Sequence, residues 1–189
     1  IVCSIQAVFE PELRRMLAFS SVAQVGYMLM GLSLASLAGL SAGLMHLTAH
    51  ATMKAALFMA LGGLAMSIRA RTLADFAGAG RDAPWTMAAF AIAAASLMGL
   101  PLTFGFLTKF RLIEAAFSAS QIWMVAVIAV SSLLGLIYVG RMLETLFFKA
   151  PAPGAVRAVE APLGVLVPLW ILALVSIWFG IDASLPENL

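Results

Sequence analysis

Residues 84–118 read PWTMAAFAIAAASLMGLPLTFGFLTKFRLIEAAFS, and this stretch decides the fold. As one straight helix it would be about 52 Å long, whereas the hydrocarbon core of a bilayer is about 30 Å thick. Gly99, Pro101 and Gly105 lie at its middle, where proline removes a helix hydrogen bond. We therefore predict a broken helix with an unwound centre. Irregular backbone is tolerated at membrane depth only where protein or a water-filled cavity satisfies it, and such broken helices recur at transport sites.

The composition excludes an ordinary soluble domain. Hydrophobic residues make up 63% of the chain and charged residues 11%, against about 45–50% and about 25% in soluble proteins. A net charge of +2 is too small to indicate nucleic acid as a partner. The single cysteine, Cys3, cannot form an internal disulfide and argues against a Cys-based metal site. The length suits about five or six membrane crossings of roughly 20 residues each.

We predict an all-α, polytopic transmembrane helical bundle that forms a single domain over residues 1–189, with about five full crossings. Residues 1–9 are predicted to be the end of a truncated helix. The predicted membrane helices span 13–36, 40–68, 84–118 (broken), 122–148 and 163–181. The chain begins with Ile1, and no basic region or cleavage site precedes the first apolar run, so we expect a piece of a longer chain without a signal peptide.

Seven basic residues lie in the loops on one predicted side of the membrane, at 10–15, 69–83 and 149–162: Arg14, Arg15, Arg69, Arg71, Arg81, Lys149 and Arg157. The loops on the other side and the C-terminal tail contain no basic residue. The positive-inside rule therefore predicts that the charged loops are cytoplasmic. The alternative to a broken helix is two ordinary crossings with a tight turn at Pro101. That alternative would separate Lys149 and Arg157 from the other basic residues.

His46, His50 and Lys54 are spaced four apart, so their side chains stack on one helical face in a polar stripe about 12 Å long. Thr48 and Thr52 border the stripe and are predicted as candidate lining residues of the same pathway. A lysine at the bilayer centre costs about 2.5–3.5 kcal/mol, and no acidic residue of the same helix could pair with it. Interhelical hydrogen bonds or an ion pair for packing would be the structural explanation. Three ionisable groups in register instead favour a proton or ion pathway, because histidine titrates near neutral pH and a desolvated lysine releases its proton more easily.

Lys109 lies about one turn past the predicted break and is the second lysine near the middle of the membrane. Two pairs spaced three apart, Arg111 with Glu114 and Arg141 with Glu144, are predicted to be local salt bridges. Metal binding by the two histidines is disfavoured by the lysine one turn away, and no metal site is predicted.

Ser20, Gln24 and Tyr27 form a polar seam on the first full helix. They line a hydrated path or serve as interhelical hydrogen-bonding groups, which are common in membranes. The sequence does not decide between these two roles.

Four segments together resemble one family: LRRMLAFSSVAQVGYM (13–28), HLTAHATMKAALFMALGG (46–63), LMGLPLTFGFLTKFRLIEAAF (97–117) and SSLLGLIYVGRMLETLFF (131–148). They look like the antiporter-like membrane subunits of respiratory NADH:quinone oxidoreductase, Mrp-type cation/proton antiporters and membrane-bound hydrogenases. The closing WFGIDASL (178–185) resembles the end of the Mrp D-type subunit.

The resemblance implies a fourteen-helix fold with two inverted five-helix repeats, each with a broken helix and an ionisable residue at the break. This chain would supply the second inverted repeat and the final helix, and the first repeat would lie outside it. By this resemblance His46, His50 and Lys54 match the central-axis residues, and Lys109 matches the ionisable residue of the second broken helix. Ala49 stands where the family usually has asparagine, which removes a polar neighbour of His50. The family's Asp-Leu-Lys-Arg entry is Glu-Leu-Arg-Arg at 12–15 here, with the same charge signs.

We expect translocation of protons, or exchange of a monovalent cation such as Na⁺ for protons, by a subunit of a multisubunit complex in a bacterial inner membrane. Its expected partners are other membrane subunits, the lipid bilayer and the moving ions, with no cofactor. The alternative is a non-conducting structural membrane fragment of a respiratory or hydrogenase complex. No nucleophile–base set or nucleotide-binding loop is readable in the sequence, so a membrane enzyme is disfavoured. The resemblance assigns redox chemistry to partner subunits.

Overall fold

Helices account for nearly all of the regular structure in the computed structural model, which describes residues 1–68, 71–153 and 156–182. In chain order they are α1 (Val2–Phe9), α2 (Leu13–Ser33), α3 (Leu37–Ala65), the 3₁₀ helix η1 (Leu73–Phe76), α4 (Ala79–Asp82), α5 (Pro84–Met98), α6 (Phe104–Ser118), α7 (Ile122–Phe147) and α8 (Leu163–Ile181). Within those residues, extended pairing is limited to one isolated bridge between Glu12 and Thr72. The predicted all-α fold class is confirmed. Arg69 and the end of the WFGIDASL segment lie outside the described residues.

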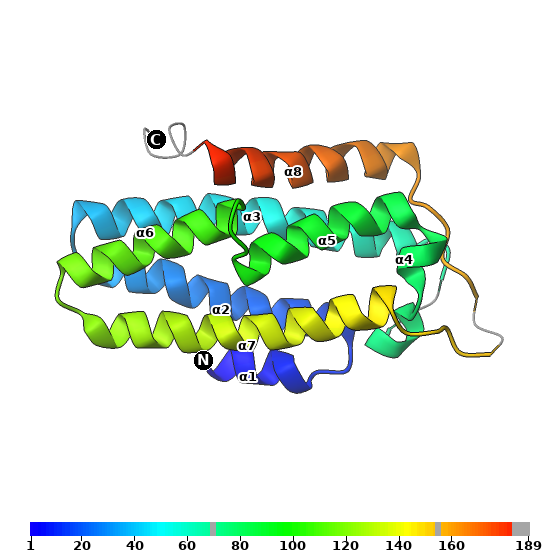
Figure 1. The fold of residues 1–189 in the computed structure, drawn as a ribbon, viewed down its shortest axis with the longest axis horizontal. Helices are drawn as coiled ribbons and strands as arrows, with labels where there is room; N and C mark the ends of the chain where they lie inside the picture. The colour runs from blue at the N-terminus through cyan, green and yellow to red at the C-terminus, as the bar shows by residue number, and fades with distance from the viewer. Residues whose placement is uncertain (69–70, 154–155, 183–189) are drawn as a thin grey trace.

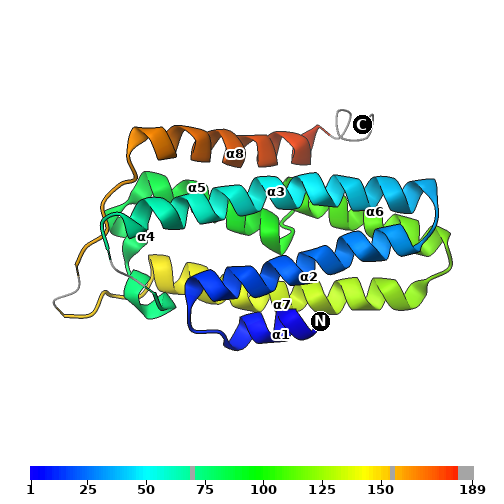
Figure 2. The ribbon, with the colours of Figure 1, turned by 180° about the vertical axis from the view of Figure 1, so that it is seen from behind.

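The long helices lie side by side along one axis of the molecule (Figure 1). α3 runs through the bundle and packs against α2, α5, α6 and α8. α5 and α6 follow one another along α3 and meet near its middle, while α1 and α8 cover opposite outer sides (Figure 2). The break between α5 and α6 therefore lies beside the centre of α3.

Local sequence explains where these helices begin and end. Pro11 separates α1 from α2, because proline cannot donate to a helix ladder. Ser36 caps α3 by accepting a hydrogen bond from the backbone N–H of Gly39 at 3.1 Å. Pro84 occupies the first turn of α5, where its missing N–H costs nothing. Thr103 caps α6 through the N–H of Phe106 at 3.4 Å.

Among the residues that the structure describes, three helices are long and apolar enough to cross a membrane by length and composition, namely α2, α7 and α8. α3 is longer, at 29 residues, but carries both histidines and Lys54. α5 and α6 have 15 residues each, fewer than the roughly 20 that one crossing needs, so the two together form one crossing with a break at its centre. The chain is a multi-pass membrane protein.

The loops that carry the basic residues meet at one end of the bundle. Leu73 donates to the carbonyl of Pro11 at 2.8 Å, and Gly78 donates to the carbonyl of Thr145 at 3.3 Å. Residues 69–83, expected to be a loop, contain η1 and α4, because Thr72 and Asp75 form a capping box that starts a helical turn.

Candidate functional site

The three ionisable groups of α3 lie inward to different degrees. The His46 side chain is fully buried, Lys54 is 6% exposed, and His50 is half-buried. The Nε2 atom of His50 is itself buried, and no described residue hydrogen-bonds to it. The helical period places the three on one face of α3, and both His46 and Lys54 bond to side chains of α2.

His46 is held by hydrogen bonds on both sides of its ring. Nε2 lies 2.8 Å from the Gln24 amide oxygen on α2, and Nδ1 lies 2.9 Å from the Thr108 hydroxyl on α6. The Tyr27 ring contacts the imidazole edge to face, with centroids 5.3 Å apart. Three helices therefore fix the ring, and the sequence analysis singled out Gln24 and Tyr27 but not Thr108.

Lys54 reaches across to α2. Its ammonium donates to the carbonyl of Leu17 at 2.8 Å and to the Ser20 hydroxyl. The Ser20 hydroxyl itself donates to the same Leu17 carbonyl at 2.9 Å, so it can accept from the lysine. Across the parts of the chain that the structure describes, no carboxylate lies within salt-bridge distance of this ammonium.

Tyr138 of α7 lies near hydrogen-bond partners of both Lys54 and His46. Its side chain is 1% exposed, and its hydroxyl lies near the side chains of Ser20 and Gln24. Tyr138 is not among the residues predicted from the sequence. A tyrosine inside the apolar segment SSLLGLIYVG was the available signal, because a buried tyrosine needs a polar partner.

These buried polar side chains form one set in the interior of the bundle, in which hydrogen bonds join Lys54 to Ser20 and join His46 to Gln24 and Thr108, while Tyr138 lies near Ser20 and Gln24. We call it the central polar line: Lys54, Ser20, Tyr138, Gln24, His46 and Thr108.

Lys109 lies at the break and satisfies the end of the preceding helix. Its ammonium donates to the carbonyls of Leu97 and Met98, each at 3.0 Å. The residue that would normally bond Leu97 is Pro101, which has no N–H. The lysine charge therefore lies where the carbonyl end of α5 carries partial negative charge. The ammonium also lies 5.7 Å from the centroid of the Tyr27 ring.

Two glycines allow the close approach at the break. Gly99 ends α5 with φ +86°, a left-handed conformation that favours glycine. Gly105 begins α6 against Ser96, and its N–H donates to the Ser96 hydroxyl at 3.1 Å. A Cβ on Gly105 would overlap the Ser96 carbonyl.

Other residues singled out from the sequence lie away from the line. The Thr48 and Thr52 hydroxyls donate to carbonyls of their own helix, at Met45 and Thr48. Positions two residues from a histidine or lysine lie about 200° round the helix, which explains their direction. Arg111 pairs with Glu114 at 2.8 Å, as the spacing predicted.

The predicted Arg141–Glu144 pair is wrong. Glu144 instead lies 3.7 Å from Lys149, because α7 ends just before Lys149 and its chain folds back beside the last turn.

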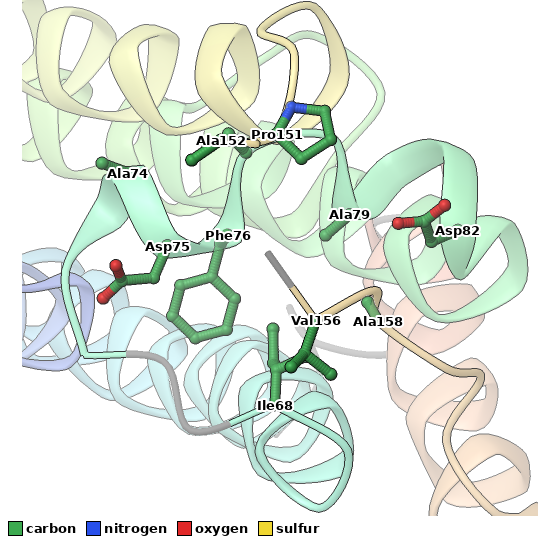
Figure 3. A pocket seen from close by; sticks show the side chains of 11 residues that line it. Ile68, Ala74, Asp75, Phe76, Ala79, Asp82, Pro151, Ala152, Val156 and Ala158 are labelled. Atoms are coloured by element: carbon green, nitrogen blue, oxygen red, sulfur yellow. The ribbon is translucent and has the colours of Figure 1, made fainter. Parts of the chain in front are cut away.

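Two surface hollows lie at opposite ends of the bundle. One, of about 310 Å³, lies among the loops around Phe76 and Asp82 and shares no residue with the central polar line (Figure 3). The other, of about 320 Å³, lies between α3 and α6 and is lined by Met45, next to His46, and by the Arg111–Glu114 pair. In the described ranges, no group of three or more His, Cys, Asp or Glu residues could hold a metal.

The comparisons with known proteins agree on one family. The model for "NADH:quinone oxidoreductase/Mrp antiporter, TM" matches residues 1–135. NADH-quinone oxidoreductase subunit N of Desulforudis audaxviator is 39% identical over 191 residues, covering 94% of this chain and 38% of the relative. F(420)H(2) dehydrogenase subunit L of Methanosarcina mazei is 35% identical over 182 residues, covering 89% of this chain and 27% of the relative.

Solved structures show the same fold. A chain of the Mrp complex from a Dietzia species superposes with a TM-score of 0.91 at 28% identity, over 99% of this chain and 43% of that one. A chain of the archaeal membrane-bound sulfane sulfur reductase gives 0.92 at 27% identity, over 99% and 31%. This chain therefore spans well under half the length of the proteins that it resembles.

Proposed function

Because the chain belongs to the NADH:quinone oxidoreductase/Mrp antiporter transmembrane family, we propose that it carries protons through the membrane as part of an antiporter-like subunit. It would do so within a multisubunit complex, as the names of its relatives indicate for those proteins. The proposal concerns the activity of a longer protein, since the chain spans only 38% of the Desulforudis relative.

The observation that carries the proposal is the central polar line. Apolar helices that only pack against each other do not need six buried polar side chains gathered from α3 and from the three helices α2, α6 and α7. Hydroxyl groups both donate and accept, so Ser20 and Tyr138 can pass a proton along. The His46 ring can bind a proton on one nitrogen and release one from the other.

The charges along the line favour protons over sodium ions. Na⁺ is expected to prefer oxygen ligands, as the hard cations Ca²⁺ and Mg²⁺ do. In the part of the chain that the structure describes, Lys54 within the line and Lys109 close to it supply two ammonium groups, and no carboxylate pairs with either. Two ammonium charges would repel a metal cation, whereas each lysine can give up and regain a proton.

The proposed proton route would open toward water at the two ends of the bundle. Of the two members of the line on α3, Lys54 lies nearer the basic loops, which the positive-inside rule predicts to be cytoplasmic. The hollow beside Met45, Arg111 and Glu114 lies at the other end and would admit water toward His46.

Exposed apolar side chains on α7 and α8, such as Leu133 and Leu174, would face lipid or neighbouring membrane subunits. These are the partners that we propose for the chain.

The test is proton translocation by vesicles that contain the complete complex, with complex content measured in parallel. We expect Lys54→Ala and Lys109→Ala to abolish most translocation without preventing insertion, since removing a membrane charge eases insertion. Lys149→Ala is the matched control, because that lysine is exposed at the end of α7. Full translocation in both site variants, with normal assembly, would leave the non-conducting structural role as the better account.

A further inference from the structure

The Thr108 hydroxyl lies between two acceptors. Its oxygen is 2.9 Å from Nδ1 of His46 and 3.2 Å from the backbone carbonyl of Gly105. A hydroxyl has one proton, so it can donate to only one of these atoms at a time. Thr108 is fully buried, so bulk water cannot substitute for either contact.

The two choices match the two charge states of the imidazole. When His46 is neutral with its proton on Nε2, that N–H donates to the Gln24 oxygen, and Nδ1 accepts from the Thr108 hydroxyl. When His46 is protonated, both ring nitrogens donate. The hydroxyl then accepts from Nδ1 and turns its own proton to the Gly105 carbonyl. Both states leave every one of these polar atoms paired, and only a hydrogen moves.

We propose that Thr108 is a positioning residue for proton transfer, whose hydroxyl rotates as His46 gains or loses its proton. This inference rests on the proposed function, because it assigns the way in which one member of the central polar line changes charge. A fully buried ring with a fixed donor at Nδ1 could not become charged without losing a hydrogen bond. The second acceptor at Gly105 removes that cost.

Several charged or titratable groups surround the same ring. Lys109 approaches from α6, His50 lies one turn away on α3 with Lys54 beyond it, Tyr27 contacts the ring from α2, and Tyr138 of α7 lies near Gln24. Protonated lysines oppose a charge on His46. The Thr108 oxygen is the one acceptor at Nδ1 in the described structure, so it has a large share in deciding whether the charged ring can form.

Thr108→Val removes the hydroxyl and keeps the shape of the side chain, while Thr108→Ser keeps the hydroxyl. In vesicles holding the complete complex, we expect Thr108→Val to lower proton translocation about tenfold to a hundredfold, the effect of losing one hydrogen bond to a charged group. Because the charged ring loses its acceptor, proton binding weakens, and the pH dependence of the rate moves toward lower pH. Thr108→Ser should keep the rate and the pH profile of the unmodified protein.

Thr145→Val is the matched control, because Thr145 is also buried but lies on α7, outside the central polar line. If Thr108→Val prevents assembly, Thr108→Cys replaces it, since a thiol is a weak donor and acceptor of similar size. A slow Cys variant beside a normal Ser variant supports the switch.

Three results would overturn the inference: a native rate and pH profile in the Val variant, a native rate in the Cys variant where Val does not assemble, or equal losses in Ser and Val. In each case, loss of translocation in Lys54→Ala would leave the proposed function standing. Native rates in the lysine variants as well would remove both.

Discussion

Replacing Lys109 by methionine tests the role of the charge at the helix break most directly. The ammonium donates to the carbonyls of Leu97 and Met98, each at 3.0 Å. Through the described residues, no backbone N–H bonds to either carbonyl, because Pro101 has none to offer and the chain leaves the helix at Gly99. Lys109→Met therefore leaves two carbonyls at membrane depth without a donor.

The magnitudes show which measurement will detect the loss. Each hydrogen bond from a charged donor contributes about 1.5–3 kcal/mol, so the variant loses about 3–6 kcal/mol at the break. Removing the ammonium also relieves a cost of about 2.5–3.5 kcal/mol for a lysine at the bilayer centre. The two effects largely cancel in overall stability. The free energy needed to open the break locally falls without such compensation. In Lys109→Met the two carbonyls have no donor in the closed state, so opening the break loses no hydrogen bond there.

We expect amide hydrogen exchange at 99–104 to become about a hundredfold faster in Lys109→Met, which corresponds to roughly 3 kcal/mol, while exchange in α7 stays unchanged. Lys109→Arg keeps a charged donor for both carbonyls but does not release its proton. Slow exchange with no proton translocation is therefore the expected behaviour of the arginine variant in the complete complex. Unchanged exchange in Lys109→Met would refute the capping role, and normal translocation in Lys109→Arg would refute proton release from this residue.

Three further substitutions test other parts of the structure. Tyr138→Phe deletes the hydroxyl that links the central polar line and should slow proton translocation in vesicles about tenfold, whereas Tyr27→Phe, which keeps the ring beside His46, should change it little. Gly105→Ala places a methyl group on a carbonyl of α5 and should reduce the amount of assembled complex on a native gel, whereas Gly62→Ala has free space and should not. The backbone N–H groups of Arg71 and then Thr72 hold the pKa of Asp75 below its usual value. The stability that Asp75 adds is therefore present above its pKa in the unfolded chain and is lost as pH falls through its pKa in the folded protein. Hydrogen-exchange protection of η1 should fall with pH in that window and become independent of pH in Asp75→Asn.

Composition and spacing alone were sufficient to predict a membrane bundle and its break. An apolar run about 35 residues long with Gly99, Pro101 and Gly105 at its centre cannot remain one straight span, whatever surrounds it. The four-residue spacing likewise places His46 and Lys54 on one face of α3, because helix geometry is local. These features depend only on neighbouring residues and on the thickness of the bilayer.

The partners of those side chains required the tertiary structure. Thr108 and Tyr138 lie 62 and 92 positions after His46, and only the packing of α6 and α7 against α2 and α3 brings them to the ring and its neighbours. The same limit applies to Thr48, because its spacing places it beside the stripe but does not show that its hydroxyl bonds a carbonyl of its own helix. Periodicity tells which face of a helix a residue occupies, but not which helix covers that face. Hydrogen-bond partners are set by that contact between helices, and it is decided when the whole bundle packs.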